Sequence, residues 1–327
     1  MSAVLEFKSV TKTYGQVTAL SRAEITAERG EIFGIVGPDG AGKSTMLRLA
    51  MGLISPDSGE IRLFGQGAPG ANRTRVGYVP QRFSLYQNLT VLENISLYSA
   101  LYAARTKAET QTLVKNILTR IGLWEFRERL AGVLSGGMKQ KLMLAVCLAH
   151  SPEALFLDEP STGVDPLSRR DFWAALYELK AGGVTIVVST PYMDEAELCT
   201  NLILLSRGEI IKRGAPDKLL EGYGQILDVY FEDAPDSSEG FKKYAAQAAR
   251  RILDTPGVLA VNAFGSHYHV EAEDLGAAIP AIRRALDSER SIDTPGGSSA
   301  AVRIEIIPPS LEDLFISSDT GNFRAPL

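Results

Sequence analysis

A glycine-rich segment with one lysine constrains this chain more than any other feature. Residues 37–45 read GPDGAGKST and fit the pattern G-x-x-x-x-G-K-[ST]. The strand-like run EIFGIVG (31–37) leads into it, and the helical run MLRLAMGL follows it. In this context the glycines let backbone N–H groups cradle phosphate oxygens at a helix N-terminus. The alternative is a glycine-rich turn without a ligand, but the flanking elements favour a phosphate-binding loop.

The chemistry of this segment assigns roles to two side chains. We expect Lys43 to reach the β- and γ-phosphates of a nucleotide and the Ser44 hydroxyl to bind Mg²⁺. The other predicted nucleotide-binding residues of the segment are Gly37, Pro38, Asp39, Gly40, Ala41, Gly42 and Thr45.

A second segment, ALFLDEP (154–160), is an apolar strand pattern that ends in two acids. An acid at the carboxyl edge of a parallel sheet lies where ligands bind. We expect Asp158 to hold Mg²⁺ through water and Glu159 to polarise an attacking water as a general base. The alternative is a solvated strand end without catalytic function.

Length and charge exclude several classes of protein. The chain has 327 residues, enough for roughly two domains of about 150 residues each. Its hydrophobic fraction of 45% and charged fraction of 22% are ordinary for a globular protein. The net charge is −5, so there is no basic field to gather nucleic acid.

The sequence also predicts a cytoplasmic protein. Charges are scattered through the first residues without the apolar core of a signal peptide. The longest apolar runs, such as 142–149, are far shorter than the ~20 residues of a membrane helix. The two cysteines, Cys147 and Cys199, are far apart and are expected to be packed thiols rather than a metal site or redox pair.

Two domains are predicted from the order of the elements. Residues 1–222 alternate strand-like and helical runs, which indicates an α/β sheet. Helical patterns from about 82 to 150 interrupt it, and Thr90 with Glu93 forms a capping box at the start of one helix. Residues 223–327 follow the order β-α-β-β-α-β of a small ferredoxin-like α+β domain. Its predicted elements include a helix at 242–253 and a flexible loop at 294–301.

The segment LSGGMKQK (134–141) decides between nucleotide-binding families. Taken alone, Ser135, Gly136 and Gly137 could simply cap a helix, or they could bind an anion at its N-terminus. Lying between a phosphate loop and an apolar Asp-Glu strand, this segment closely resembles the signature motif of ABC-transporter ATPases. The resemblance is strong over residues 4–222 and loose beyond them.

Further segments match the family in the same order. Tyr14 resembles the aromatic residue that stacks on adenine, and Gln81 resembles the glutamine that touches Mg²⁺ and senses the membrane partner. The run STGVDP, with Ser161 and Asp165, resembles the loop that crosses the dimer interface. The run YMDEAE (192–197) resembles the helix after the switch histidine, and PSLEDLF (309–315) resembles the end of an accessory domain in drug-export members.

The resemblance implies a P-loop NTPase fold with a RecA-like core, an antiparallel β-subdomain and a helical subdomain. It implies a head-to-tail dimer in which ATP and Mg²⁺ lie between one chain's phosphate loop and the other chain's signature. It also implies a separate integral-membrane permease, which would hold the ATPase against the inner face of the cell membrane. Whether the dimer is a homodimer or a heterodimer with a second ABC ATPase is left open.

Three positions depart from the family pattern. Asp39 stands where asparagine is common, and Met138 stands where the signature usually has glutamine. Pro191 stands where family members carry the histidine that contacts the γ-phosphate. Proline has no N–H and no polar side-chain group, so it cannot donate a hydrogen bond there.

Three functions therefore remain in competition. The first is the ATP-binding subunit of an ABC exporter, in which ATP hydrolysis drives multidrug or other export. The second is a soluble ABC protein that acts on ribosomes or DNA, although no tandem ATPase halves or basic extensions are visible. The third is a regulatory or weakly hydrolysing subunit that pairs with a complete ATPase, which Pro191 favours and Glu159 opposes.

Overall fold

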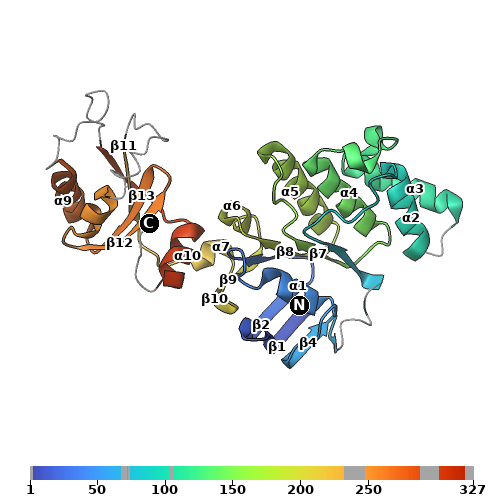
Figure 1. Ribbon diagram of the computed structural model, residues 1–327, viewed down its shortest axis with the longest axis horizontal. Helices are drawn as coiled ribbons and strands as arrows, with labels where there is room; N and C mark the ends of the chain where they lie inside the picture. The colour runs from blue at the N-terminus through green and yellow to red at the C-terminus, as the bar shows by residue number, and fades with distance from the viewer. Residues whose placement is uncertain are drawn as a thin grey trace. The chain divides into compact units, whose positions relative to one another are not determined.

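The chain forms two compact units (Figure 1), Met1–Pro216 and Asp217–Leu327. This computed structural model describes residues 3–67, 72, 74–102, 106–231, 247–287 and 302–320. The first unit ends before the domain boundary that we expected after Gly222. Within the described ranges, none of the helices combines the length and apolar character required to cross a bilayer.

A six-stranded sheet forms the centre of the first unit, in the order β10-β9-β3-β8-β7-β6. All neighbouring strands are parallel except the pair β9 and β10. Every residue of β3, β7 and β8 is buried, as expected for strands covered on both faces. The strands are β3 (Ile32–Val36), β6 (Val76–Val79), β7 (Ala154–Asp158), β8 (Thr185–Thr190), β9 (Asn201–Ser206) and β10 (Glu209–Gly214).

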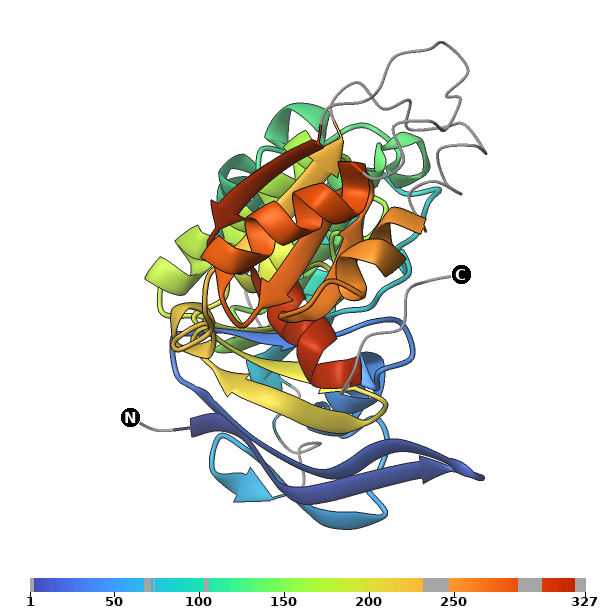
Figure 2. The same cartoon turned by 90° about the vertical axis from the view of Figure 1, so that its left-hand side faces the viewer.

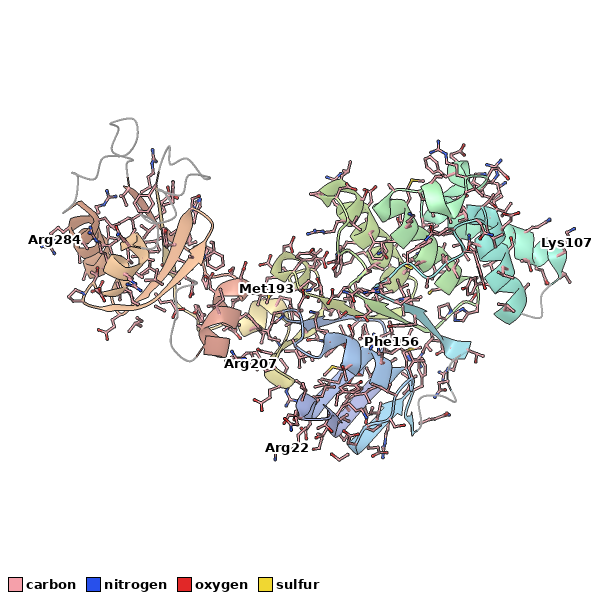
Figure 3. All side chains as sticks on the ribbon, in the orientation of Figure 1. Arg22, Lys107, Phe156, Met193, Arg207 and Arg284 are labelled. Atoms are coloured by element: carbon pink, nitrogen blue, oxygen red, sulfur yellow. The ribbon has the colours of Figure 1, made fainter. Side chains whose placement is uncertain are left out.

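A smaller antiparallel sheet of order β2-β1-β4-β5 lies in the same unit. Its strands are β1 (Ala3–Tyr14), β2 (Val17–Glu28), β4 (Ser58–Leu63) and β5 (Gln66–Gly67). Side chains from this sheet, from helix α1 (Lys43–Ala50) and from the central strands share one apolar core. That core includes Phe156 of β7 (Figure 3), which is fully buried.

Helices α2 (Val91–Tyr102), α3 (Lys107–Arg120), α4 (Gly136–Leu148) and α5 (Pro166–Ala181) lie on the opposite side of the central sheet from α1 (Figure 1). The capping box expected before α2 is confirmed. The Thr90 N–H donates to Glu93 Oε2 at 2.8 Å, and the Glu93 N–H donates to Thr90 Oγ1 at 3.1 Å. Two short helices, α6 (Met193–Ala196) and α7 (Pro216–Leu219), follow β8 and β10.

The second unit is an antiparallel sheet with its own apolar core. The strand order is β12-β13-β11-β14, and every neighbouring pair is antiparallel. Figure 2 shows α9 (orange) lying across this sheet. The elements are β11 (Ile226–Phe231), β12 (Val258–Phe264), β13 (His267–Ala272), α9 (Leu275–Asp287), β14 (Val302–Ile307) and α10 (Leu311–Thr320). Residues 247–253 are also helical, whereas 242–246 and the expected loop at 294–301 lie outside the described residues.

Candidate functional site

The segment 37–42 forms a tight loop between β3 and α1. The Gly37 N–H donates to the Thr190 carbonyl at 3.3 Å, which joins the loop to the end of β8. Gly42 has φ 111°, and a Cβ there would lie 2.4 Å from the Ala19 carbonyl oxygen. Only glycine fits such a backbone and such a close approach. The close approach at Gly42 therefore restricts the conformation of the loop. Pro38, Asp39 and Gly40 are exposed at its tip.

Lys43 is buried at the first turn of α1, with 3% of its side chain exposed. Its ammonium donates to the carbonyl oxygens of Gly37 at 2.8 Å and Pro38 at 2.9 Å. A third contact joins Nζ to Glu159 Oε1 at 3.0 Å. These contacts match the three donors of a lysine ammonium. Lys43 thus closes the loop and balances the charge of Glu159.

Asp158, the last residue of β7, gathers hydroxyl groups. Its Oδ1 accepts from Ser44 Oγ and from Ser189 Oγ, each at 2.9 Å. Its Oδ2 accepts from the Tyr78 hydroxyl at 3.3 Å. Burial, aided by the negative charge of Asp158, raises the pKa of Tyr78 to about 12. Tyr78 therefore stays protonated and donates to Asp158.

Glu159 is buried at the carboxyl edge of the sheet in a left-handed backbone conformation, with φ 48°. Such a conformation costs a non-glycine residue about 1–2 kcal/mol. The Glu159 N–H donates to Ser189 Oγ at 3.0 Å, which holds the turn. Its carboxylate accepts from Gln81 Nε2 at 2.9 Å and from Thr162 Oγ1 at 3.4 Å, besides contacting Lys43.

Two of the three expected metal-binding residues, Ser44 and Asp158, are joined by a hydrogen bond. Ser44 and Asp158 present adjacent oxygens, a hydroxyl and a carboxylate, and Mg²⁺ prefers oxygen ligands of this kind. These two residues therefore fit the ion. The third expected residue, Gln81, donates from Nε2 to Glu159 Oε2, and its contact with the metal stays a prediction.

Three contributors to this cluster were not predicted from the sequence: Tyr78, Thr162 and Ser189. Ser189 is adjacent to Asp158 because β7 and β8 pair with Asp158 opposite Ser189. Part of the signal was present, since β8 ends in the hydroxyl residues Ser189 and Thr190 and β6 carries Tyr78 one residue before its end. The register that aligns them becomes visible only in the folded chain.

The signature segment begins α4, where Ser135 is the N-cap and its hydroxyl accepts from the Met138 N–H at 3.3 Å. A Cβ at Gly137 would lie 2.5 Å from Ser168 Cβ of α5, so the packing of the two helices requires that glycine. A Cβ at Gly136 would meet only the Gly163 carbonyl oxygen, at 3.7 Å. Packing therefore explains Gly137 but gives no reason for glycine at 136.

The same contacts place the signature beside the 161–165 loop. Asp165 caps α5 by accepting from the Ser168 N–H at 2.9 Å, and this hydrogen bond lowers the pKa of Asp165. Ser161 is 1% exposed, and its hydroxyl has no hydrogen-bond partner among the described residues.

Two further predicted residues lie at strand ends. Pro191 directly follows Thr190, which pairs with Val36 in the parallel register of β3 and β8. Position 191 is therefore beside the entrance to the phosphate loop. Tyr14 ends β1 with 48% of its surface exposed, and Lys12 Nζ lies 5.6 Å from the centroid of its ring.

Comparison with known proteins agrees with this geometry. A family model described as ABC transporter matches residues 20–162. Over 219 residues the chain is 42% identical to the probable multidrug ABC transporter ATP-binding protein YbhF of Escherichia coli. That match covers 66% of this chain but only 38% of YbhF. Over 318 residues the chain is 33% identical to the Nod factor export ATP-binding protein I of Bradyrhizobium diazoefficiens, covering 95% of each.

A solved structure supports the fold. It is a dimeric ATP-binding cassette in a post-hydrolysis state bound to ADP and Pi, and it superposes with a TM-score of 0.60. Its sequence is 29% identical, and the match covers 64% of this chain and 98% of the cassette. The fold of the first unit is that of a P-loop ATPase cassette.

Proposed function

Because this chain belongs to the family of ABC-transporter ATP-binding proteins, we propose that it binds Mg-ATP and couples ATP hydrolysis to export through a separate membrane permease. The observation that carries this proposal is the buried cluster of Lys43, Ser44, Asp158 and Glu159 at one edge of the central sheet. A cation, a hydroxyl and two carboxylates together suit a magnesium–phosphate ligand.

Nucleotide binding would exchange one partner of Lys43 for another. Phosphate oxygens entering the loop compete with the Glu159 carboxylate for the Lys43 ammonium. A Lys43 that turns to the phosphates leaves Glu159 with its contacts to Gln81 and Thr162 and a free Oε1. Glu159 then accepts a proton from the attacking water, which is the role of a general base. Magnesium, held by Ser44 and Asp158, would neutralise phosphate charge when bound.

The active form would be a head-to-tail dimer. Ser135 and Gly136 are exposed at the N-terminus of α4, where free N–H groups favour an anion. They would complete the nucleotide site of the opposite chain, with the 161–165 loop crossing between the two. The solved cassette described above is also a dimer, which supports the proposal of a dimeric form.

A surface on the helical part suits the permease. It consists of exposed apolar side chains on α2 and on the segments 86–89 and 130–133. Two backbone hydrogen bonds join these segments, from Gly132 N to Gln87 O and from Ala131 N to Leu89 O. Contiguous exposed apolar residues mark interaction sites in soluble proteins. The residues are Tyr86, Leu97, Leu101, Leu130 and Val133. Through this surface the protein would lie at the inner face of the membrane.

Pro191 favours a second candidate, a subunit whose own site hydrolyses ATP weakly. The retained Ser135 and Gly136 would complete the site of a partner ATPase with an intact switch histidine. A heterodimer would then combine one efficient site and one impaired site. The homodimeric alternative requires another group to replace the histidine.

The test separates binding from hydrolysis with Glu159→Gln, which keeps the size of the side chain and removes its basicity. We expect the variant to bind Mg-ATP as tightly as the wild type, within about threefold, and to lose at least about 100-fold in turnover. Glu209→Gln makes the same chemical change at an exposed position of β10 and is the control, which should keep wild-type turnover. Undiminished turnover by Glu159→Gln would exclude Glu159 as the general base. Copurification with a membrane permease would distinguish the exporter from a soluble ABC protein.

A further inference from the structure

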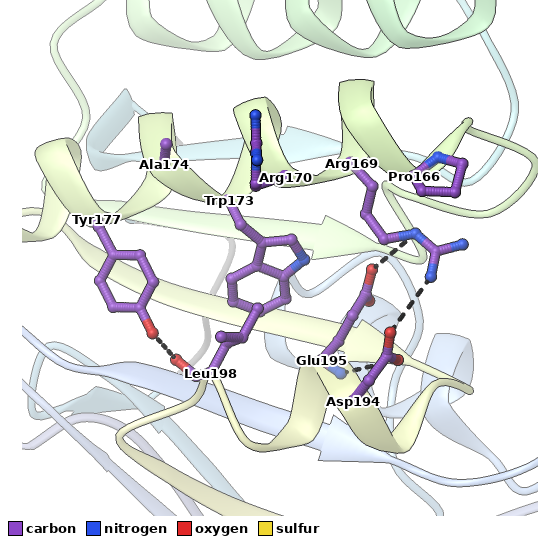
Figure 4. A pocket seen from close by; sticks show the side chains of 9 residues that line it. All are labelled: Pro166, Arg169, Arg170, Trp173, Ala174, Tyr177, Asp194, Glu195 and Leu198. Carbon is purple, nitrogen blue, oxygen red and sulfur yellow. Dashed lines mark hydrogen bonds and ion pairs between the residues drawn. The ribbon is translucent and has the colours of Figure 1, made fainter.

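A groove of about 390 Å³ lies between α5 and residues 194–198, and charged side chains cross one end of it (Figure 4). Arg169 extends from α5 toward α6, where it meets Asp194 Oδ2 at 3.5 Å and Glu195 Oε1 at 3.6 Å. Its guanidinium also lies 4.4 Å from the centroid of the Tyr192 ring. One arginine therefore holds three residues of the segment that follows Pro191.

Glu195 is the most deeply buried member of this group, with 1% of its side chain exposed. Its Oε2 accepts from Thr190 Oγ1 at 2.5 Å. No hydrogen bond in the described part of the chain reaches Oε1, so the charge of Arg169 is what balances that oxygen. A buried carboxylate is costly unless it is paired, and this pairing makes its position depend on Arg169.

Thr190 connects the Glu195 side chain to the backbone on both sides of Pro191. Its hydroxyl donates to Glu195 and accepts from the Tyr192 N–H at 3.1 Å. Its carbonyl accepts from the Gly37 N–H at the start of the phosphate loop. Because Pro191 has no N–H, these neighbouring hydrogen bonds are what fix the chain at this point.

Helix α6 is only four residues long, and a helix this short is not stable by itself. Its placement must therefore come from side-chain contacts. We propose that Arg169 and Glu195 are positioning residues, which hold the backbone of Thr190–Tyr192 and thereby hold Gly37, at the start of the phosphate loop, in place for hydrolysis at the nucleotide site. This inference rests on the proposed function, but Arg169 and Glu195 touch neither the phosphate loop nor Glu159 in the contacts described above.

The chain offers a matched pair of variants for the test. Glu195→Gln keeps one oxygen to accept from Thr190 but loses the charge that pairs with Arg169. Glu197→Gln makes the same chemical change at an exposed position two residues further on. Thr190→Val is a second test variant, since it removes the shared hydroxyl and keeps the shape of the side chain.

Hydrogen exchange provides the first measurement, and it needs no nucleotide. In Glu195→Gln and Thr190→Val, the amides of Tyr192 and Ala196 should exchange at least about tenfold faster than in the wild type. Glu197→Gln should leave them within about twofold. Equal exchange in Glu195→Gln and Glu197→Gln would overturn the positioning role.

Steady-state kinetics with Mg-ATP provides the second measurement. We expect kcat to fall about tenfold in Glu195→Gln and Thr190→Val, with the Kd for Mg-ATP unchanged within about twofold. The double variant Arg169→Met/Glu195→Gln should be no slower than the slower single variant, since both residues act through one contact. Equal losses in kcat and affinity would indicate a merely structural role and overturn the proposal. A wild type that neither binds nor hydrolyses ATP would instead refute the proposed function, and hydrogen exchange would still decide whether the residues hold the segment.

Discussion

Position 191 is the residue at which we expect the chemistry of the nucleotide site to depart most from that of the family. Pro191 follows the last residue of β8, beside the hydrogen bond between Thr190 O and Gly37 N. Proline is compatible with the bend at this point, but it offers no donor to a γ-phosphate. Glu159 and Lys43 remain, so slow rather than absent hydrolysis is expected.

The prediction is that Pro191→His raises ATP turnover of the purified protein several-fold, about 1 kcal/mol in the barrier. The histidine would supply the hydrogen bond that proline lacks. Turnover of the two proteins at matched ATP saturation is the measurement. Fast hydrolysis by the wild type, lowered or unchanged by histidine, would contradict it.

The two signature glycines should respond differently to the same methyl group. Gly137→Ala places a Cβ 2.5 Å from Ser168 Cβ, so we expect it to destabilise the packing of α4 on α5 by about 1–3 kcal/mol. Gly136→Ala meets only ordinary contact at 3.7 Å, so the fold should tolerate it. It should nevertheless lower ATP turnover by the dimer, because the added methyl group would obstruct a phosphate that approaches the N-terminus of α4.

Thermal unfolding and steady-state turnover of both variants check this prediction. The prediction would be contradicted if Gly136→Ala lost as much stability as Gly137→Ala, or if it kept full turnover. Gly136 would then have only a structural role at the start of α4.

At the scale of the elements, a partly buried ion pair joins α10 to the sheet of the second unit. His269 Nδ1 on β13 lies 2.7 Å from Asp313 Oδ1 in the first turn of α10. Asp313 is 1% exposed and also accepts from the Ser310 N–H at 2.8 Å. Burial opposes the charged form of His269, but the hydrogen bond and charge of Asp313 outweigh it, so the pKa of His269 is raised.

This pair predicts a pH-dependent stability of the second unit. The pKa of His269 is raised in the folded state, so protonated His269 stabilises the fold. This contribution to the free energy of unfolding is complete below pH 6.5, the ordinary pKa of histidine, and is lost as the pH rises through the folded pKa. We expect His269→Gln to cost about 1–2 kcal/mol near pH 6 and clearly less near pH 9.

Unfolding curves of the full chain at the two pH values provide the measurement. His267→Gln is the comparison: it removes a more exposed ion pair, His267 Nδ1 to Asp228 Oδ2 at 2.9 Å with the His267 side chain 45% exposed, and should cost less at pH 6. A penalty for His269→Gln that does not change with pH would show that the charge of His269 contributes nothing.

The elements differ in how far the sequence alone could predict them. The phosphate loop, the acidic strand and the start of α2 were predicted because contiguous residues carry each signal. Strand β2 was not predicted, although Ala23, Ile25 and Ala27 alternate toward the core. Arg22, with φ 44°, interrupts that alternation, and the pairing with β1 shifts register nearby. Strand β10 was also missed, because its outward face is polar.

The sequence proposed the residues of the candidate site but not the contacts between them. The sequence indicated Lys43 and Glu159 but not that they form an ion pair, because this pairing depends on the folded positions of α1 and β7. Gln81 was expected at the metal, which stays a prediction; its hydrogen bond from Nε2 to Glu159 was not foreseen. The link from Arg169 through Glu195 to Thr190 joins residues up to 26 positions apart, and no local pattern reveals it.

At the scale of the whole molecule, all the proposed nucleotide chemistry lies in the first unit. Each unit has a separate apolar core, the first around α1 and the two sheets, the second around β11 and α9. All the nucleotide-site residues lie before Pro216. The match to the Nod factor export protein covers both units, which indicates that relatives combine them in one chain.

The most direct test of the central claim is calorimetry of Mg-ATP binding to the full-length wild type and to Lys43→Ala. Lys43 would make a charge-assisted hydrogen bond to phosphate, worth about 1.5–3 kcal/mol, so its loss should weaken binding at least about tenfold. Lys218→Ala, at an exposed position, is the matched control and should bind as the wild type does. A thermal unfolding curve confirms that Lys43→Ala is folded. If folded Lys43→Ala bound Mg-ATP with unchanged affinity, the phosphate-loop assignment would be wrong.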